Sequence, residues 1–440
     1  MTVQESEGVT PKVGVVGRKV VPQRDTLWLS GADAINLVFG IIIHVVLTRA
    51  LLSDEYGTFV LLLDFFHVCV ILVDLGLPTL IARDGGRLGN HLSELLTKIS
   101  SLQIVLMWVI AIAAMFVVGS FNSVWKNPAF LLAIGAGLQV LAYSFRSAFR
   151  ALGEARLEAL VRVSDRAIVA LLMATWATDL PTLAGATALG PAFALAISMS
   201  VWKWRIEPGL NEPNENAPET AKMGRRDLVR TGLPFLVAGA ALIINIRIEK
   251  LLLGVLATPQ DVAVFQIAWL GFIAGYGPIL SLRAVLLSWF GEVRDDYNKL
   301  LHRYNRALFA TGILALIGMG IGLLVAPFAF GNLFPEYTEL VERPFYGLLL
   351  AWLFHTMASP SLALIQVSEK PWNYSRILWL GIIVSTIASL YLIPTQPSAV
   401  DGAVVAAILG SLFVFAFAFT GAKSWLTTQS GIENLGEAHT

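Results

Sequence analysis

The stretch Leu228–Leu256, LVRTGLPFLVAGAALIINIRIEKLLLGVL, decides how this chain folds. It is long enough to cross a lipid bilayer, because a membrane-spanning helix needs about 20 mainly apolar residues. It nevertheless carries Arg247, Glu249 and Lys250 inside its apolar run. A charged side chain at the middle of a bilayer costs on the order of 3 kcal/mol, even on the scale that gives the smallest penalties. The three charges therefore predict that this helix lines a polar cavity within a membrane protein.

The composition of the whole chain supports a membrane protein. Its 440 residues are 56% hydrophobic and 14% charged, and the mean hydropathy is +0.70. Soluble domains carry about 25% charged residues, so the composition favours a polytopic helical membrane protein over a soluble one. Cys69 is the only cysteine, and the six histidines show no paired metal-ligand spacing. The sequence therefore predicts no internal disulfide, no metal site, no cofactor and no nucleic-acid partner.

Twelve apolar segments predict an all-α integral membrane fold with two groups of six spans. We expect the spans at residues 27–52, 57–82, 95–118, 128–149, 162–179, 181–205, 229–256, 261–290, 306–330, 344–367, 375–393 and 400–426. The segment between the sixth and seventh spans is rich in Pro, Asn and Glu, which is typical of a flexible linker. The predicted organisation is a polar tail (1–26), a first lobe (27–205), a cytoplasmic linker (206–228), a second lobe (229–426) and a second tail (427–440).

The distribution of Lys and Arg predicts the orientation. With the N-terminus inside, 26 of the 31 Lys and Arg residues fall in cytoplasmic segments and three in outer ones. Cytoplasmic loops carry the excess of positive charge in membrane proteins. We therefore predict a multi-pass protein of the cell (cytoplasmic or inner) membrane with both termini cytoplasmic.

The two halves show a weak internal repeat. A shift of 201 residues aligns the first span with the seventh and pairs Gly31 with Gly232, His44 with Asn245, Thr48 with Glu249 and Arg49 with Lys250. Two pseudo-symmetric lobes around a central cavity suit a transporter that rocks about a site between its halves. The repeat also predicts that Glu249 and Asn245 face the cavity, whereas it leaves Arg247 without a clear place.

Polar residues form a stripe along the second span. Asp64, His67 and Asp74 share one helical face, and Pro78 follows one turn later as a predicted kink. Ionisable residues within a span are candidates for function, so a solvated cavity face or a proton relay is one interpretation. The alternative is that these groups only hydrogen-bond to neighbouring helices and fix their packing.

Other charged residues admit simpler interpretations. Arg283 lies near the inner end of the eighth span, from which it is expected to reach the interface, and His355 is expected to be a satisfied polar residue. A basic cluster between the fourth and fifth spans is expected to anchor the protein to lipid headgroups, or to form a vestibule that attracts a phosphate-bearing substrate. Its members are Arg146, Arg150, Arg156, Arg162 and Arg166.

Three groups of short motifs carry a family resemblance. Residues 49–59 (RALLSDEYGTF) leading to 74–78 (DLGLP) resemble the first two spans of polysaccharide flippases, which belong to the multidrug/oligosaccharidyl-lipid/polysaccharide exporter superfamily. Residues 231–235 (TGLPF) and 248–254 (IEKLLLG) are similar to the seventh span of that family, with Glu249 where an Asp is usual. Phe330-Gly with Glu336-Tyr337, and Leu392-Ile-Pro leading to Asp401-Gly-Ala, look like its last four spans. Residues 397–401 (PSAVD) depart from the usual glycine-rich approach.

The resemblance implies a function, whereas the candidate residues rest on the polar stripes described above. Such proteins move lipid-diphosphate-linked oligosaccharides from the inner to the outer leaflet and are not enzymes, so no catalytic residue is expected. The implied partners are the lipid-linked oligosaccharide, the bilayer and glycan assembly proteins. Cationic and polar side chains would contact the substrate, namely Arg49, Arg247, Lys250, Asn245 and His44. Ionisable groups would couple transport to H⁺ or Na⁺, namely Asp64, His67, Asp74 and Glu249.

Three other functions stay open from the sequence. A drug or small-molecule exporter of the same superfamily would share the fold. A membrane-embedded glycan polymerase or ligase would be expected to carry a large outer loop, whereas the longest outer connection here is roughly residues 331–343. A scaffold without transport activity would leave the polar stripes without a purpose.

Overall fold

The computed structural model describes residues 22–176, 178–210, 219–294, 296–368 and 372–437. These residues form fourteen α-helices and short 3-10 or π turns, with no strand among them. The helices of the first half are α1 (Pro22–Ala50), α2 (Ser53–Asp74), α3 (Leu77–Asp84), α4 (His91–Phe121), α5 (Lys126–Ala151), α6 (Ala155–Trp176) and α7 (Leu180–Val201). Those of the second half are α8 (Arg225–Asn245), α9 (Ile248–Leu256), α10 (Pro259–Gly291), α11 (Tyr297–Leu333), α12 (Thr338–Val367), α13 (Trp372–Thr395) and α14 (Ala399–Glu437).

Eleven of the described helical segments are long and apolar enough to cross a membrane. Helix α6 is of similar length, with 22 residues, and it packs against α1 and α7. It is more polar than the others because it carries five charged residues, Arg156, Glu158, Arg162, Asp165 and Arg166. The prediction of an all-helical membrane protein is confirmed. The short helices α3 and α9 continue two of the predicted spans, each of which is broken in the structure.

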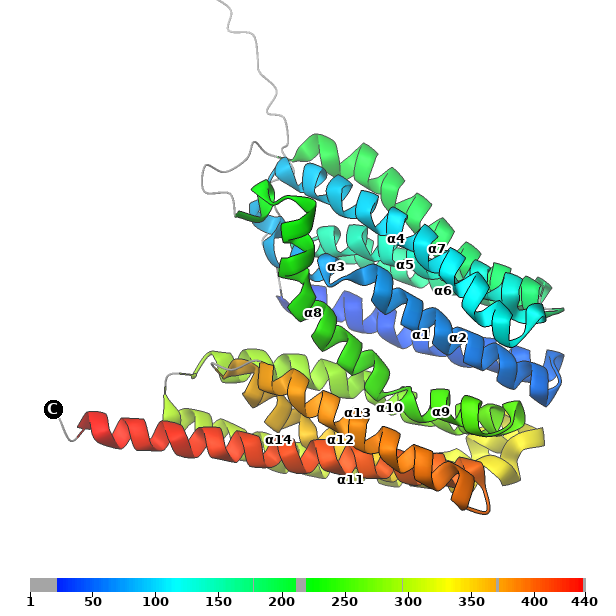
Figure 1. The fold of residues 1–440 in the computed structure, drawn as a ribbon. Coiled ribbons are helices and arrows are strands. Elements are labelled where there is room, and N and C mark those ends of the chain that lie inside the picture. Colours follow the sequence, from blue (N-terminus) through cyan, green and yellow to red (C-terminus); the bar gives the residue numbers. More distant parts are fainter. Residues whose placement is uncertain (1–21, 177, 211–218, 295, 369–371, 438–440) are drawn as a thin grey trace, which may run out of the picture.

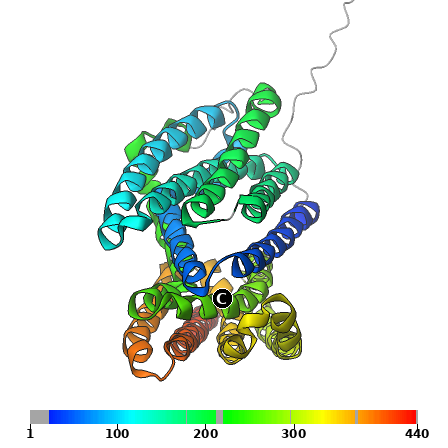
Figure 2. The same cartoon turned by 90° about the vertical axis from the view of Figure 1, so that its right-hand side faces the viewer.

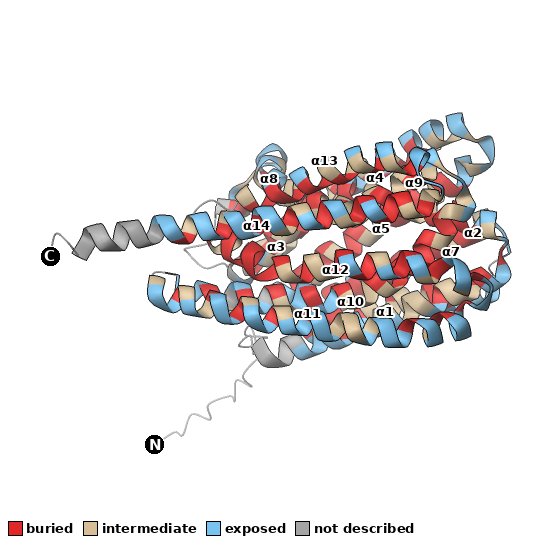
Figure 3. Ribbon diagram, turned by 90° about the horizontal axis from the view of Figure 1, so that it is seen from below, coloured by how far each residue is buried: buried red, intermediate tan, exposed pale blue. Residues whose placement is uncertain are grey.

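The helices form two groups (Figure 1). Helices α1–α7 lie together in one group and α9–α14 in the other, while α8 runs obliquely between them. The view turned by 90° shows the same separation (Figure 2). Buried residues lie on the sides of the helices that face one another, and exposed residues lie on the outer sides (Figure 3). Many exposed residues are large and apolar, for example Trp108, Phe116 and Leu324, as expected for a surface in contact with lipid chains.

The two lobes share a hydrophobic core at one end only. There, Leu47, Tyr56 and Phe59 of the first lobe pack in one cluster with Phe265 and Trp269 of the second. This is the end where α1 turns into α2, which the Lys and Arg distribution predicts to face outside. Towards the other end, each lobe has a separate core. The lobes are therefore closed against each other at the predicted outer end.

The second predicted span breaks between α2 and α3. Leu75 and Gly76 have positive φ angles of 49° and 70°, and the Asp74 Oδ2 atom accepts a hydrogen bond of 3.0 Å from the Gly76 N–H. A Cβ at Gly76 would lie 2.3 Å from the carbonyl oxygen of Gly232 on α8, so only glycine allows this approach. The kink predicted from Pro78 is present as this break: α2 ends at Asp74, four residues before the proline, and Pro78 lies in the first turn of α3.

The seventh predicted span also breaks, between Asn245 and Ile248. Helix α8 ends at Asn245, and α9 begins at Ile248 with Arg247 as its N-cap residue. The prediction of one continuous helix over 229–256 is therefore wrong. Discontinuous helices are typical of binding sites in transporters, because the broken turn exposes backbone groups and redirects side chains.

Candidate functional site

The break between α8 and α9 directs two cations at one carboxylate of the other lobe. The Arg247 guanidinium donates from Nη1 to Asp64 Oδ1 at 2.8 Å, and Lys250 Nζ lies 3.0 Å from Asp64 Oδ2. Asp64 is 1% exposed and Lys250 is 2% exposed. Because Asp64 belongs to α2 and both cations belong to the second half of the chain, this buried ion triad joins the two lobes.

A chain of hydrogen bonds continues from Lys250 into the first lobe. Lys250 Nζ donates to Gln266 Oε1 of α10 at 2.5 Å, and the Gln266 amide nitrogen lies 3.3 Å from His44 Nε2 of α1. The other ring nitrogen of His44 is 2.9 Å from the hydroxyl of Tyr56 on α2. Four helices thus contribute to one polar network that crosses between the lobes twice.

An aromatic ring covers the cations of this network. Lys250 Nζ lies 4.4 Å from the centroid of the Trp269 ring, and Arg247 Cζ lies 5.7 Å from it. A cation over an indole face is stabilised by about 0.5–2 kcal/mol, more where water is excluded. Trp269 therefore compensates part of the cost of burying two positive charges beside a single carboxylate.

Three cations gather where the lobes meet. Asp64 is shared by Arg247 and Lys250, and Arg166 of α6 lies close enough to Arg247 to interact electrostatically. Asp165 interacts with Arg166 but does not pair with the two cations at Asp64. A buried charge without a full complement of opposite charge costs several kcal/mol. Lys250 also interacts electrostatically with the Glu249 carboxylate, but Asp64 is the carboxylate that both cations contact directly. An anionic ligand offers the same kind of charge-assisted hydrogen-bond acceptor and could take the place of Asp64.

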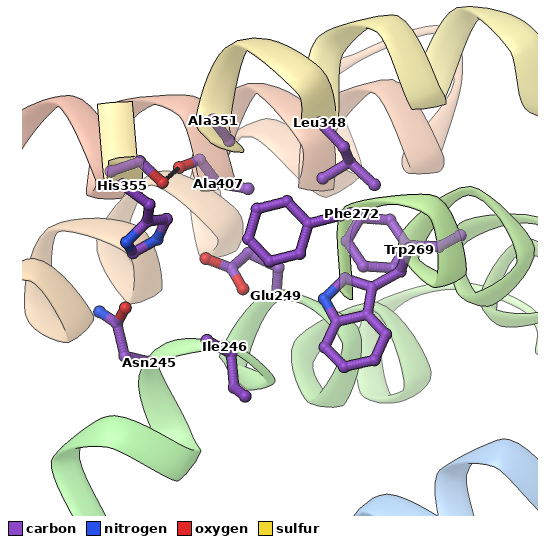
Figure 4. Close-up of a pocket in the computed structure, with 11 residues that line it drawn as sticks. Asn245, Ile246, Glu249, Trp269, Phe272, Leu348, Ala351, His355 and Ala407 are labelled. Carbon is purple, nitrogen blue, oxygen red and sulfur yellow. Dashed lines mark hydrogen bonds between the residues drawn. The ribbon is translucent and has the colours of Figure 1, made fainter. Parts of the chain in front are cut away.

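Glu249 and Asn245 face a different place, inside the second lobe (Figure 4). They line a pocket with residues of α10, α12 and α14, among them Phe272, His355 and Ser411. Its volume is about 20 Å³, room for about one water molecule. The hydroxyl of Ser385 on α13 donates to the Glu249 carboxylate. Glu249 is thus a buried carboxylate with a small polar pocket beside it.

The other candidate residues make no hydrogen bond or ion pair with the triad, although His67 lies close enough to Arg247 and Lys250 to interact with them electrostatically. Arg49 is exposed in the last turn of α1, although the repeat pairs it with the buried Lys250. The Nδ1 atom of His67 lies 2.6 Å from the backbone oxygen of Leu63, and the Asp74 carboxylate caps the break between α2 and α3. Among the predicted residues, the structure brings together His44, Asp64, Arg247 and Lys250.

Sequence reasoning missed three members of the network: Tyr56, Gln266 and Trp269. Gln266 gave a usable signal, since it is an uncharged polar residue within the apolar run VAVFQIAWLG of the eighth span. Such a residue usually seeks a partner across helices. The two aromatic residues gave none, because aromatic side chains are common throughout the spans.

The basic cluster between the fourth and fifth spans is largely paired within its own lobe. Arg150 forms an ion pair with Glu158, and Arg162 lies 2.6 Å from Asp33. Arg156 lies over the ring of Trp28, with Cζ 5.5 Å from the centroid. These contacts support an anchoring role for three of its members, whereas Arg166 lies close enough to Arg247 to interact with it electrostatically.

Comparisons with known proteins agree with this architecture. A family model described as polysaccharide biosynthesis protein matches residues 23–273. No curated protein sequence matches the chain. Among solved structures, the inward-facing conformation of a multidrug resistance MATE family transporter of the MOP superfamily has a TM-score of 0.75 at 16% identity, covering 93% of this chain and 99% of that one.

Two further solved structures have the same fold. The outward-facing conformation of a multidrug resistance MATE family transporter has a TM-score of 0.66 at 15% identity, covering 97% of this chain and 100% of that one. A MOP superfamily transporter from Pyrococcus furiosus, described as having a binding pocket of reverse polarity, has a TM-score of 0.67 at 17% identity, covering 96% of this chain and 100% of that one.

Proposed function

Because the chain belongs to the polysaccharide biosynthesis protein family and shares the fold of a transporter of the MOP superfamily, we propose that it moves a lipid-diphosphate-linked oligosaccharide across the membrane. The substrate would pass from the inner to the outer leaflet by alternating access between the two lobes. We also propose that the protein lies in the cell membrane with both termini in the cytoplasm, and that it is divided into the two lobes set out above. Its proposed partners include glycan assembly proteins. The family and the fold support a role without catalysis.

The observation that carries this proposal is the ion triad of Asp64, Arg247 and Lys250. A diphosphate accepts charge-assisted hydrogen bonds from guanidinium and ammonium groups, as a carboxylate does. A substrate that enters between the lobes would compete with Asp64 for the two cations. Since those ion pairs join the lobes at the closed end, their loss would favour opening on that side. Binding would thereby shift the population towards the arrangement that releases the substrate.

A drug exporter is the second candidate, supported by the similarity to multidrug transporters. The charge of the site distinguishes the two functions. A cationic drug placed between the lobes would meet Arg247, Lys250 and Arg166, and like charges repel. We therefore favour an anionic substrate and expect cationic drugs to be poorly transported.

Glu249 is our proposed ion-coupling residue. It is the buried carboxylate of the second lobe, with the Ser385 hydroxyl and a pocket of one-water size beside it. Such a group can exchange a proton, or bind Na⁺ through oxygen ligands. Asp64 would contribute to coupling through its ion pairs, whereas His67 and Asp74 make local backbone contacts and are weaker candidates.

The test replaces the cations singly and separates transport from folding. We expect Lys250→Ala and Arg247→Ala to lower glycan export far more than they lower the amount of protein in the membrane, with Lys250→Arg retaining part of the activity. Arg343→Ala is the matched control, because the Arg343 side chain is 83% exposed. Export that falls only in proportion to protein abundance would show that the triad merely supports the fold.

A further inference from the structure

Arg283 of α10 is a buried cation that the proposed transport mechanism does not use. It is 6% exposed, so the prediction that it reaches the membrane interface is wrong. Its Nη1 atom donates to the Tyr374 hydroxyl at 3.3 Å and its Nη2 atom to the Ser359 hydroxyl at 3.5 Å. Its Nε atom is buried with no hydrogen-bond partner. The guanidinium is therefore only partly satisfied.

The groups around Arg283 are polar but carry no negative charge. Tyr276 and His355 lie close enough to interact with it, and their rings meet edge to face with centroids 5.7 Å apart. Tyr276, His355, Ser359 and Tyr374 are each at most 7% exposed. In the part of the chain that the structure describes, no carboxylate forms an ion pair with Arg283. Neutral hydroxyls from α10, α12 and α13 thus surround an uncompensated cation.

The cost of this arrangement points to a missing negative charge. A buried charge without a counter-charge is penalised by several kcal/mol, and proteins normally pair it. A guanidinium offers five N–H donors. Those of Arg283 make two long hydrogen bonds to the hydroxyls of Tyr374 and Ser359 and also interact with the Tyr276 hydroxyl, whereas Nε is left without a partner. The donors remaining, together with the hydroxyls of Tyr276 and Tyr374, form a shell suited to an anion.

We propose that Arg283, Tyr276 and Tyr374 bind a small inorganic anion of the halide class inside the second lobe. The surrounding residues are buried, which excludes the headgroup of a lipid-linked sugar in this arrangement. The bound anion would hold α10, α12 and α13 together through the residues that each helix contributes.

The first test measures the thermal stability of the purified full-length protein as chloride replaces gluconate at constant ionic strength. Ligands that bind the folded state raise its stability with concentration. We expect chloride and bromide to raise the unfolding temperature in a saturable manner. Arg283→Gln should abolish that rise or increase the half-maximal concentration about tenfold or more, as expected for the loss of a charged hydrogen bond. Arg376→Gln, which changes an exposed arginine of α13, should behave as the unchanged protein.

A second measurement keeps the proposal testable if Arg283→Gln fails to fold. Tyr374→Phe removes one hydroxyl from the shell and should increase the half-maximal chloride concentration several-fold. In crystals grown with bromide, anomalous scattering should place an ion within hydrogen-bond distance of the Arg283 guanidinium. The proposal is overturned if chloride gives no saturable shift, if Arg283→Gln and Tyr374→Phe leave the half-maximal concentration unchanged, or if bromide lies elsewhere.

Discussion

Replacing Gly57 by alanine should open the lobes at their closed end. Gly57 lies in the first turns of α2, and the facing segment begins α10 at Pro259. A Cβ at Gly57 would lie 1.8 Å from the carbonyl oxygen and 2.5 Å from the carbonyl carbon of Pro259. Real Cβ contacts under 3.0 Å are essentially never seen. Because the obstacle is backbone and not a flexible side chain, the two lobes must separate to accept the methyl group.

The size of the shift between the closed and open arrangements follows from the fact that the clash occurs only in the closed one. Overpacking of one methyl group in a well-packed contact costs about 1–3 kcal/mol. The cost applies to the closed arrangement, since the contact joins α2 of one lobe to α10 of the other. An energy of that size shifts a two-state equilibrium about 5- to 150-fold. Gly57→Ala should therefore raise the population that is open at the predicted outer end by that factor.

Labelling of a buried cysteine measures this shift. Ala263 lies one turn along α10 from Pro259 and is fully buried, so a membrane-impermeant maleimide should react with Ala263→Cys only when the lobes part. The reaction rate should rise by the predicted factor in Gly57→Ala. Gly40→Ala is the control, because a Cβ there meets nothing within 4 Å. Equal labelling rates in the two backgrounds would refute the reasoning, and the native Cys69 should be replaced beforehand.

Two further predictions concern the charged groups. Asp64→Asn leaves Arg247 and Lys250 without their carboxylate and should lower the free energy of unfolding by about 3–5 kcal/mol. Adding Lys250→Met should recover part of that loss. A double variant no more stable than Asp64→Asn would contradict the pairing of Lys250 with Asp64. Glu249→Gln keeps a hydrogen-bond partner for Ser385 but cannot lose or gain a proton near neutral pH. In proteoliposomes its transport should no longer respond to an imposed pH or Na⁺ gradient, and an unchanged response would exclude Glu249 as the coupling group.

The membrane fold could be predicted from the sequence because the bilayer constrains it so strongly. Each crossing must be helical and about 20 residues long, so apolar length alone located the spans. The breaks were not predictable in the same way. Residues 244–248 read INIRI and contain neither Gly nor Pro, so no local signal marks the end of α8. Arg247, which lies at the break, pairs with Asp64, which is 183 positions away in the chain.

The same break explains why Glu249 and Asn245 do not lie with the other predicted site residues. Pairing the two halves of the sequence assumed that the seventh span is as regular as the first, which placed Glu249 and Asn245 in a central cavity. Because the chain is redirected at Arg247, Lys250 instead faces Asp64 in the other lobe, and Glu249 faces Ser385 on α13. Arg49, the counterpart of Lys250 by alignment, is exposed. Alignment of the repeats therefore preserved the order of residues but not the direction of their side chains.

The position of the break also suggests how substrate binding would be transmitted. Leu228, early in α8, packs in the core of the first lobe, whereas Ala241, near its end, packs in the core of the second. A helix held by both lobes must bend or tilt when they rock, and the interruption beyond Ala241 allows the end of α8 to change its angle to α9. Arg247 lies at that interruption and pairs with Asp64 across the lobes. An anionic substrate that takes Arg247 from Asp64 would therefore release the contact between the lobes at the point where the chain is most easily bent.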